Sequence, residues 1–326
     1  IAVSEGGSLV AEGALFQISG GVLGQGIFVE NGTVDVDGTQ VTGTVSVAGT
    51  EGQLLRQLSP ALTLRVHGGS PGMGHAWLRA ANGAVNAGTL LLESSSAAWA
   101  SELYTAPGQV LENTATGRIR SALGSGGRRV ATLTLRNAGV VEGVDGHGLD
   151  FVGNYVSEGG RVGAEVQFVG STVDLTQAPV AGSAFTLVGD VSRLLSDVPA
   201  GTAVRVIAGQ GAGHGTVELP TDFSNFGEME FTTVGAGWTV RVAQLGLGRL
   251  RNEAGGRLRI TQGAGGRRIF EGAVENLGHM EILNPVEWDR GIRNAAGGTA
   301  QVGVLQQEVG SGSMFANAGT LIATNG

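Results

Sequence analysis

Short runs in which apolar and polar residues alternate recur along the whole chain, and residues 33–37, 132–136 and 228–231 are clear examples. Successive side chains of a β-strand point to opposite faces, so a period of two predicts strands. The runs are three to seven residues long and are separated by Gly or Asn, which favour turns. Helical periodicity is weak, and residues 53–58 and 192–197 are the best candidates for one or two helical turns. The pattern therefore predicts an all-β fold of many short strands.

The sequence also repeats itself at one constant offset, so that position 1 of the first copy corresponds to position 140. Trp99 matches Trp238 at this offset, Asn137 matches Asn276, and further identities extend from residue 20 to residue 139. A single offset maintained over such a length indicates a tandem duplication. We therefore predict one continuous solenoid whose parts are copy one at 1–139, copy two at 140–278 and a partial, divergent third copy at 279–326.

A shorter period lies within each copy and is marked by asparagine. Asn-x-Gly followed by apolar residues begins at 86, 137, 225, 276 and 317, and the variant Asn-x-Ala-x-Gly begins at 113, 252 and 294. Successive start positions differ by 27 and 24 in both copies, then by 18 and 23. This spacing predicts coils of roughly 23 residues, about 14 in all, which stack as parallel strands about 4.8 Å apart. The predicted fold is a right-handed parallel β-helix (β-solenoid); a β-sandwich is the alternative, although it would not need the same corner to recur.

The recurring asparagines are predicted to stack at one corner of the coils. Asn tolerates the left-handed backbone conformation and Gly adopts it without steric cost, so both residues suit a corner. In register, each side-chain amide can hydrogen-bond to the amide or the backbone of the next coil, which satisfies groups that the turn leaves unpaired. The predicted ladder consists of Asn86, Asn113, Asn137, Asn225, Asn252, Asn276, Asn294 and Asn317.

Three of these motifs carry a resemblance to known proteins. Residues 86–90 and 317–321 read Asn-Ala-Gly-Thr-Leu, and residues 137–141 read Asn-Ala-Gly-Val-Val. In these motifs the sequence resembles the passenger and repeat regions of bacterial autotransporters and filamentous-haemagglutinin-type exoproteins. The resemblance is clearest from residue 86 onward, and it implies a right-handed parallel β-helix that is exported to the cell surface and is commonly adhesive. It specifies the architecture far better than an activity.

Composition narrows the class of protein further. The chain has 59 glycines and 7 prolines, with 41% hydrophobic and 15% charged residues, which argues against collagen and against disorder. It contains neither cysteine nor lysine, which excludes disulfides, a thiolate metal site and a Schiff-base lysine. We therefore expect no cofactor. The net charge of −8 and the lack of a long apolar segment disfavour nucleic-acid binding and membrane insertion.

An enzyme that degrades polysaccharides would need clustered carboxylates on one face of the solenoid. Asp35 and Asp37 share one face of a predicted strand, but Asp174 repeats Asp35 in the second copy, whereas a catalytic site is expected once. Residues 287–290 (Glu-Trp-Asp-Arg) lie where the repeat departs from its pattern, so they are a second candidate. His75 and His214 each lack another ligand at metal spacing, so we predict neither a metal site nor a catalytic residue.

Arginine pairs and tryptophans are the candidate binding residues. With Ile119 inward, Arg118 and Arg120 share the outer face, where guanidinium groups could bind the phosphates or carboxylates of surface polymers. Alternatively, these arginines pair with Glu93, Glu112, Glu253 and Glu271. The candidate binding set comprises Arg118, Arg120, Arg128, Arg129, Arg257, Arg259, Arg267, Arg268 and Trp288. Trp99 and Trp238 fit either sugar stacking or corner packing.

The duplication lengthens the fold and does not build a unique pocket, so the sequence predicts an extracellular structural or adhesive rod, secreted or at the cell surface. Glycans or other surface polymers are the expected partners. The last motif, at 317–323, resembles the middle of a repeat, so we also expect end-to-end self-association. The alternatives are a carbohydrate-active enzyme (polysaccharide lyase or glycoside hydrolase), which would have one acidic groove, and a phage or tail-fibre module, which would be an intertwined trimer.

Overall fold

The computed structural model describes residues 9–19, 21–23, 27–36, 41–69, 74–122, 124, 126–144, 146, 148–209, 213–261, 263–264, 266–303 and 314–323. Within these ranges the secondary structure consists of β-strands that pair in parallel. The same ranges contain no helix long and apolar enough to cross a membrane. The described residues form about 13 coils of about 22 residues each, which is close to the predicted values. The prediction of an all-β parallel solenoid is confirmed.

The two segments that were compatible with helical turns contain short strands and no helix. Residues 53–58 belong to β6 (Val41–Leu54) and β7 (Gln57–Leu58), and residues 192–197 begin with β22 (Ser192–Leu194). The expectation of helix was wrong because each segment pairs with a neighbouring coil; Leu58, for example, is aligned with Asn86. Such pairing overrides a weak local preference.

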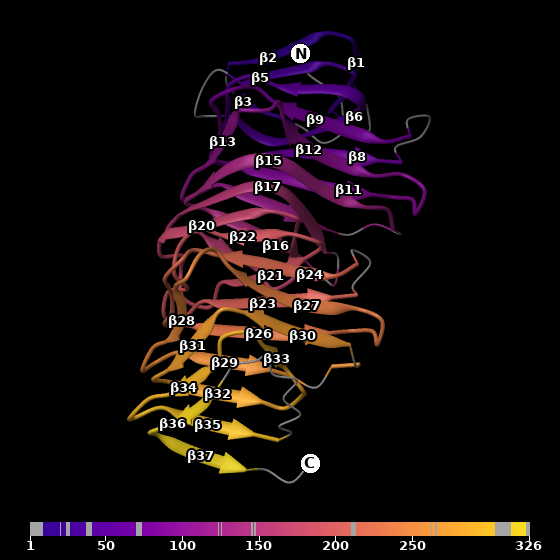
Figure 1. Cartoon of the computed structure of the whole chain (residues 1–326). Helices are drawn as coiled ribbons and strands as arrows, with labels where there is room; N and C mark the ends of the chain where they lie inside the picture. The colour runs from indigo at the N-terminus through magenta and orange to yellow at the C-terminus, as the bar shows by residue number, and fades with distance from the viewer. Residues whose placement is uncertain are drawn as a thin grey trace. The chain divides into compact units, whose positions relative to one another are not determined.

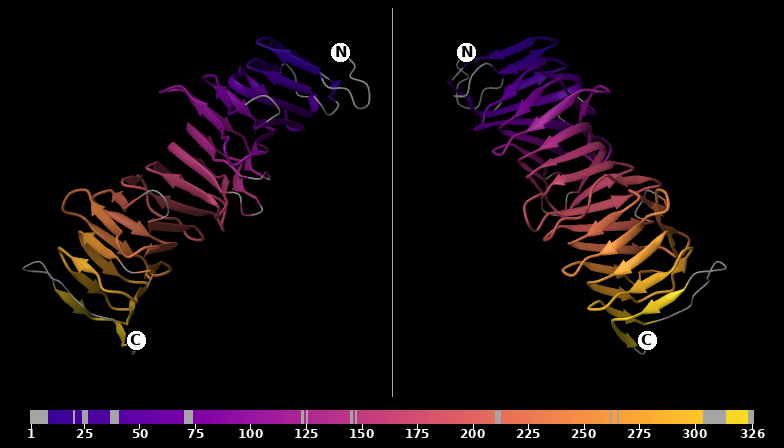
Figure 2. Two further views of the ribbon diagram at one scale, coloured as in Figure 1. Left: turned by 90° about the vertical axis from the view of Figure 1, so that its right-hand side faces the viewer. Right: turned by 60° about the vertical axis from the view of Figure 1, so that its left-hand side comes forward.

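The chain divides into two compact units, Ile1–Gln167 and Phe168–Gly326, and passes from one to the other within β19 (Val166–Val169). Each unit is a stack of coils in which the strands form three parallel ladders (Figure 1 and Figure 2). The predicted repeat boundaries, after residues 139 and 278, remain predictions.

In the first unit, successive coils contribute one strand or half-strand to each ladder. The first ladder contains β1 (Leu9–Glu12), β4 (Ile27–Glu30), part of β6, β8 (Leu62–Gly68), β11 (Thr89–Ser94), β14 (Arg118–Ser121), β16 (Val140–Gly143) and β18 (Arg161–Val162). The second contains β2 (Leu15–Ile18), β5 (Thr33–Val36), the end of β6, β9 (Ala76–Ala80), β12 (Ser101–Thr105) and the first halves of β15 (Arg129–Asn137) and β17 (Leu149–Glu158). The third contains β7, β10 (Ala84–Asn86), β13 (Val110–Asn113) and the second halves of β15 and β17, while β3 (Gly21–Val22) pairs with the start of β6.

The second unit has the same plan. Its first ladder contains β21 (Ala184–Val188), β23 (Ala203–Ala208), β26 (Glu228–Thr233), β29 (Arg257–Ile260), β32 (His279–Ile282), β35 (Thr299–Val302) and β37 (Thr320–Ala323). Its second contains β20 (Thr172–Gln177), β22, β24 (Gly215–Leu219), β27 (Thr239–Gln244), β30 (Arg267–Glu271) and β33 (Glu287–Trp288). Its third contains β25 (Phe223–Asn225), β28 (Arg249–Asn252), β31 (Ala273–Asn276), β34 (Ile292–Asn294) and β36 (Phe315–Asn317).

Columns of apolar side chains fill the interior of each unit, one side chain from each coil. In the second unit Phe231, Ile260 and Ile282 are aligned in the first ladder and buried. Phe270 of the second ladder contacts Phe231 edge to face, with ring centroids 5.0 Å apart. Burial of such side chains contributes roughly 1.5–3 kcal/mol each. Because the alternate residues point outward, the three outer faces carry the side chains available for function.

Candidate functional site

The predicted asparagines of the first unit form one buried ladder. The Nδ2 atom of Asn86 donates to Oδ1 of Asn113 at 2.7 Å, and Nδ2 of Asn113 donates to Oδ1 of Asn137 at 2.7 Å. Asn137 in turn donates to the hydroxyl of Tyr155 at 2.9 Å. The Oδ1 atom of Asn86 has no partner in the described part of the chain, so the ladder begins there and runs in one direction.

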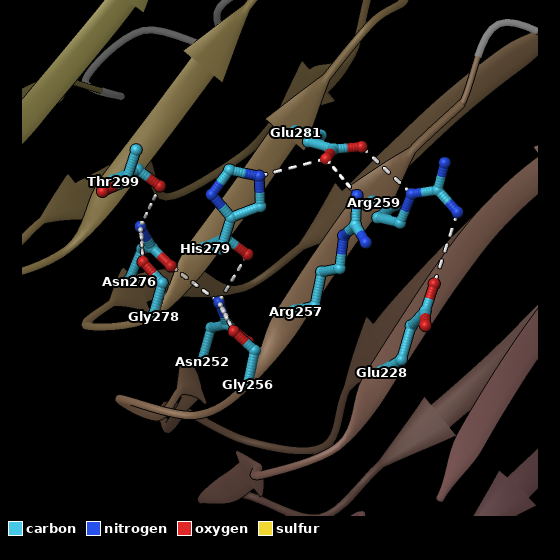
Figure 3. Close-up of polar contacts among 10 residues, drawn as sticks. All are labelled: Glu228, Asn252, Gly256, Arg257, Arg259, Asn276, Gly278, His279, Glu281 and Thr299. Carbon is cyan, nitrogen blue, oxygen red and sulfur yellow. Dashed lines mark hydrogen bonds and ion pairs between the residues drawn. The ribbon is translucent and has the colours of Figure 1, made fainter. Parts of the chain in front are cut away.

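The second unit contains the longer ladder. Asn225, Asn252, Asn276, Asn294 and Asn317 are linked successively by amide–amide hydrogen bonds of 2.7–2.8 Å. Each of the first four also donates to a backbone carbonyl one coil further on; Asn252 reaches His279 O and Asn276 reaches Thr299 O, both at 3.0 Å (Figure 3). The amides therefore satisfy both one another and the backbone at the corner.

The glycine of each motif is explained by close packing and not by backbone conformation. Gly88, Gly139 and Gly278 do not have the positive φ expected at a corner, and the motif asparagines do not either. A Cβ atom on Gly139 would lie 2.2 Å from Gly117 O, and one on Gly278 would lie 2.2 Å from Glu253 O. Only glycine allows the next coil to approach so closely. The prediction of left-handed corners was wrong, although the positions it selected do stack.

Most of the predicted arginines on the first unit lie outside and are neutralised. Arg118 and Arg120 flank the buried Ile119 on β14, and both approach the carboxylate of Glu142, at 3.7 and 2.9 Å. Arg128 is paired with Asp150 at 3.0 Å. These arginines are therefore part of an ion-paired face and not an unbalanced basic stripe.

In the second unit two of the four predicted arginines converge on one carboxylate. Glu281 accepts hydrogen bonds from Arg257 and from Arg259, at 2.5 and 3.0 Å, and lies 3.0 Å from the Nε2 atom of His279 (Figure 3). Arg259 also reaches Glu228 at 3.3 Å. Burial raises the pKa of Glu281, but the hydrogen bonds from its neighbours outweigh that effect and lower the pKa to about 2.

The carboxylates that were expected to pair with the predicted arginines do not form those ion pairs. Glu281, Glu142 and Asp150 bind the predicted arginines, and Glu287 binds Arg267 at 2.5 Å. The expected carboxylates that form ion pairs bind other arginines: Glu93 pairs with Arg65, Glu253 with Arg251 and Glu271 with Arg241. Partners are set by the register between coils, which a local pattern does not contain.

We expect Glu281→Gln to destabilise the chain at neutral pH by about 1–2 kcal/mol. A carboxyl group whose pKa is lower in the folded chain contributes stability above its unfolded pKa, and that contribution is lost as the pH falls toward the folded value. The difference between native chain and variant should therefore shrink from about pH 4.5 to about pH 2. Calorimetric unfolding at several pH values measures it. Glu112→Gln, which removes an exposed carboxylate without a described ion pair, is the control; equal profiles for the two variants would contradict the prediction.

Arg129 and Arg268, which were predicted to lie on the binding face, are buried instead. Arg268 is 1% exposed, and its guanidinium donates to Gly266 O at 2.7 Å and to Thr261 O at 3.2 Å. Arg129 makes the corresponding bond to Gly127 O at 2.9 Å. Burial lowers the pKa of both guanidinium groups. Adjacent strand residues face opposite sides, so one arginine of each pair had to point inward; that signal was present in the sequence.

The segment 287–290 does not form an acidic site. Trp288 is 5% exposed and packs on Phe270 with ring centroids 4.5 Å apart, so it is a core residue and not a sugar platform. Glu287 is bound to Arg267, and Asp289 accepts a hydrogen bond from the backbone of Gly272. Arg290 donates to Gly246 O at 3.1 Å. Apart from a 3.9 Å approach of Arg290 to Asp289, the three polar side chains serve separate contacts.

The remaining described candidates for catalysis are also engaged in other contacts. Asp35 forms a bidentate pair with Arg56 at 2.7 and 2.8 Å, and Asp174 accepts hydrogen bonds from the backbone and hydroxyl of Thr176. Asp37 lies outside the described residues. Among the residues described, no three of His, Asp and Glu come together to hold a metal ion.

Trp99 and Trp238 lie at equivalent corners of the two units, each beside a histidine. Trp99 meets His75 edge to face with centroids 5.2 Å apart, and Trp238 meets His214 at 5.5 Å. Each histidine Nδ1 accepts a backbone N–H from the following coil at 3.0 Å. Both tryptophans are about 40% exposed. The repetition of this contact indicates a corner-packing role.

One exposed aromatic cluster was missed by the sequence reasoning. Trp77 points outward from β9 and is 38% exposed, and its ring lies 6.2 Å from that of His75. The register between β9 and β12 places Trp77 beside Glu102, and Arg79 beside Tyr104. Arg79 is exposed and forms no ion pair with a described carboxylate. We call Trp77, Arg79, Glu102 and Tyr104 the Trp77 face.

The Trp77 face does not recur in the second unit. At the constant offset of the predicted sequence repeat, Trp77, Arg79 and Tyr104 correspond to Thr216, Glu218 and Ala243. Residues that the fold needs, such as Trp99 and Arg129, recur at the repeat offset. Exposed residues that do not recur are therefore not required by the fold. Comparison of the two copies is the signal that could have found this face.

Comparison with known proteins adds little. No protein-family model matches the chain, and no curated protein sequence matches it. Among solved structures, a TibA fragment described as hyper-glycosylated in a reaction catalysed by TibC aligns with 97% of this chain and 97% of its own, at 13% identity and a TM-score of 0.33. Such values carry no argument about function, and the fold assignment rests on the strand pairing described above.

Proposed function

We propose that this chain is a non-enzymatic structural and adhesive β-solenoid, exposed outside the cell, that binds glycans on the Trp77 face. The observation that carries the proposal is that face itself: two outward aromatic side chains, a carboxylate and an arginine without an ion-pair partner among described residues, on a sheet held rigid by its neighbours. Aromatic rings stack on the apolar faces of sugars, and polar neighbours bind the hydroxyl groups.

The arrangement of the other charged residues supports a scaffold and not an enzyme. Among the candidate carboxylates that the structure describes, Asp35 and Glu287 are bound to arginines and Asp289 to the backbone, so these three lack the paired, unengaged geometry that glycoside cleavage needs. The buried ladders and closely packed glycines hold each coil on the next. A regular stack of this kind presents broad faces at fixed spacing, which suits attachment to polymers.

We expect Trp77→Ala to weaken glycan binding by about tenfold, because loss of one stacked ring removes roughly 0.5–1.5 kcal/mol beyond its buried area. The native chain and the variant should be titrated against oligogalacturonate, whose carboxylates suit Arg79, and against a neutral glucan. Trp238→Ala removes an equally exposed tryptophan at a repeated corner and is the matched control.

Equal affinity of the native chain and Trp77→Ala, or an equal loss in Trp238→Ala, would contradict the assignment of the Trp77 face. Release of shortened sugars from any polysaccharide in a degradation screen would favour the enzymatic alternative. The screen therefore distinguishes an adhesive protein from an enzyme even if each would bind the same polymer.

The same proposal includes a right-handed coil, the hand that crossover connections between parallel strands nearly always take, and stacking of copies end to end. Electron microscopy of the purified chain tests the assembly. Single rods or filaments of stacked rods agree with an adhesive scaffold, whereas an intertwined trimer would favour a tail-fibre module.

A further inference from the structure

A hollow of about 240 Å³ opens on the third outer face of the second unit. Its charged lining residues are Arg249 of β28, Glu275 of β31, Arg293 of β34 and Arg290 from the turn before β34. The apolar part of the lining includes the highly exposed Leu247. We call this the arginine hollow. Drug-sized ligands occupy pockets of about 300–1,000 Å³, so it would hold something smaller.

The arginine hollow has more positive charge than its carboxylate can balance. Glu275 lies 3.2 Å from Arg249, 3.5 Å from Arg293 and 3.5 Å from Arg251. Arg290 is bound to a backbone carbonyl, and its distance to Asp289 is 3.9 Å. The three arginines and one glutamate of the lining sum to +2, in a chain whose net charge is −8.

Two other outward arginines of the same unit are each matched by one carboxylate. Arg193 pairs with Glu218 at 2.6 Å and Arg205 pairs with Glu230 at 3.0 Å, each across adjacent coils. Such alternation stabilises a parallel ladder because opposite charges lie side by side. The arginine hollow departs from it.

The excess charge is also absent from the first copy. There, the positions of Arg249, Arg251 and Glu275 are occupied by Val110, Glu112 and Arg136. The stack of coils therefore does not require arginine at positions 249 and 251. Charge that the fold does not need, concentrated around a concavity, points to a ligand.

We propose that the arginine hollow binds a small organic anion, a sugar unit that carries a phosphate or a carboxylate. Guanidinium forks match the oxygens of both groups and donate charge-assisted hydrogen bonds. Arg249 and Arg293 approach Glu275 from opposite sides and are half exposed or more, so they retain donors for an anion. Leu247 offers the apolar contact for the sugar ring. The inference does not rest on glycan binding at the Trp77 face.

The test is calorimetric titration of the full chain with glucose 6-phosphate, glucuronate and glucose. We expect both anions to bind, glucose to bind at least tenfold more weakly, and affinity to fall as salt is raised. Arg249→Gln/Arg293→Gln should weaken anion binding at least tenfold, whereas Arg193→Gln/Arg205→Gln, which removes the same charge from evenly paired positions, should not. A preference for one anion distinguishes phosphorylated from uronate-bearing ligands.

No binding of either anion by the native chain would overturn the proposal, as would equal binding of glucose or equal losses in the two double variants. Because the replaced side chains are exposed, we expect both variants to have the same unfolding temperature as the native chain. Thermal unfolding measurements check this. A negative result for the arginine hollow does not affect the proposal for the Trp77 face. That proposal is tested separately, by the effect of Trp77→Ala in the first unit on binding of a polymer.

Discussion

Asn252→Leu should lower the free energy of unfolding by about 3 kcal/mol, more than most single substitutions. Leucine has the same number and branching of side-chain heavy atoms as asparagine but can neither donate nor accept, so the predicted loss comes mainly from hydrogen bonds. The variant removes the acceptor of Asn225 and the donor of Asn276, and it leaves His279 O without its side-chain partner. Each buried polar group deprived of a partner costs about 1–3 kcal/mol, while Asn225 keeps its bond to Arg257 O, which limits the total.

Thermal and denaturant unfolding of the native chain and the variant measure this loss. Asn317→Leu is the matched control, because Asn317 belongs to the same ladder but is exposed at its last rung; we expect it to cost less than about 1 kcal/mol. If Asn252→Leu costs no more than Asn317→Leu, the ladder does not stabilise the stack in the way its geometry indicates.

Arg268→Met should destabilise the chain by about 2–4 kcal/mol, whereas Arg267→Met, one residue earlier, should cost no more than about 1 kcal/mol. Arg268 is buried and donates to two backbone carbonyls and to the hydroxyl of Thr233. Methionine fills a similar volume but cannot donate, so those acceptors lose charge-assisted hydrogen bonds. Arg267 is exposed and pairs with Glu287 in water.

The comparison of Arg268→Met with Arg267→Met shows whether the buried charge stabilises the chain. Replacing a buried charged group by an apolar one of similar size is sometimes neutral or stabilising. Were Arg268→Met as stable as the native chain, the guanidinium would be a packing element whose charge contributes nothing. Unfolding of both variants under the same conditions, with Arg129→Met as the equivalent in the first unit, measures the difference.

The parallel solenoid could be predicted because its signal repeats. A period of two predicts strands locally, and recurrence of asparagine at similar spacing predicts that strands stack and do not fold back into hairpins. Asn252 and Asn276 are aligned as that reasoning requires. The conformation of the corner was not predictable in the same way, because glycine serves two purposes and the sequence does not distinguish positive φ from close approach of a neighbouring coil.

The candidate binding residues were harder to predict. Arg267 and Arg268 are chemically identical and adjacent, yet one is exposed and the other buried. Trp288 resembles a sugar platform in sequence, but Phe270 of the previous coil covers it. The Trp77 face and the arginine hollow depend on which outward residues remain after neighbouring coils have paired, so they emerge only from the aligned register.

Local alternation and the spacing of asparagine by themselves determined the strands, their parallel stacking and the residues of the buried ladder. Only the tertiary structure decided which carboxylate meets which arginine, which of two adjacent arginines is buried and where positive charge is left unbalanced. The physical reason is that contacts in a parallel stack join residues one coil apart. Coil length varies, so Arg257 meets Glu281 and not Glu253, and the register is set by packing of the whole coil.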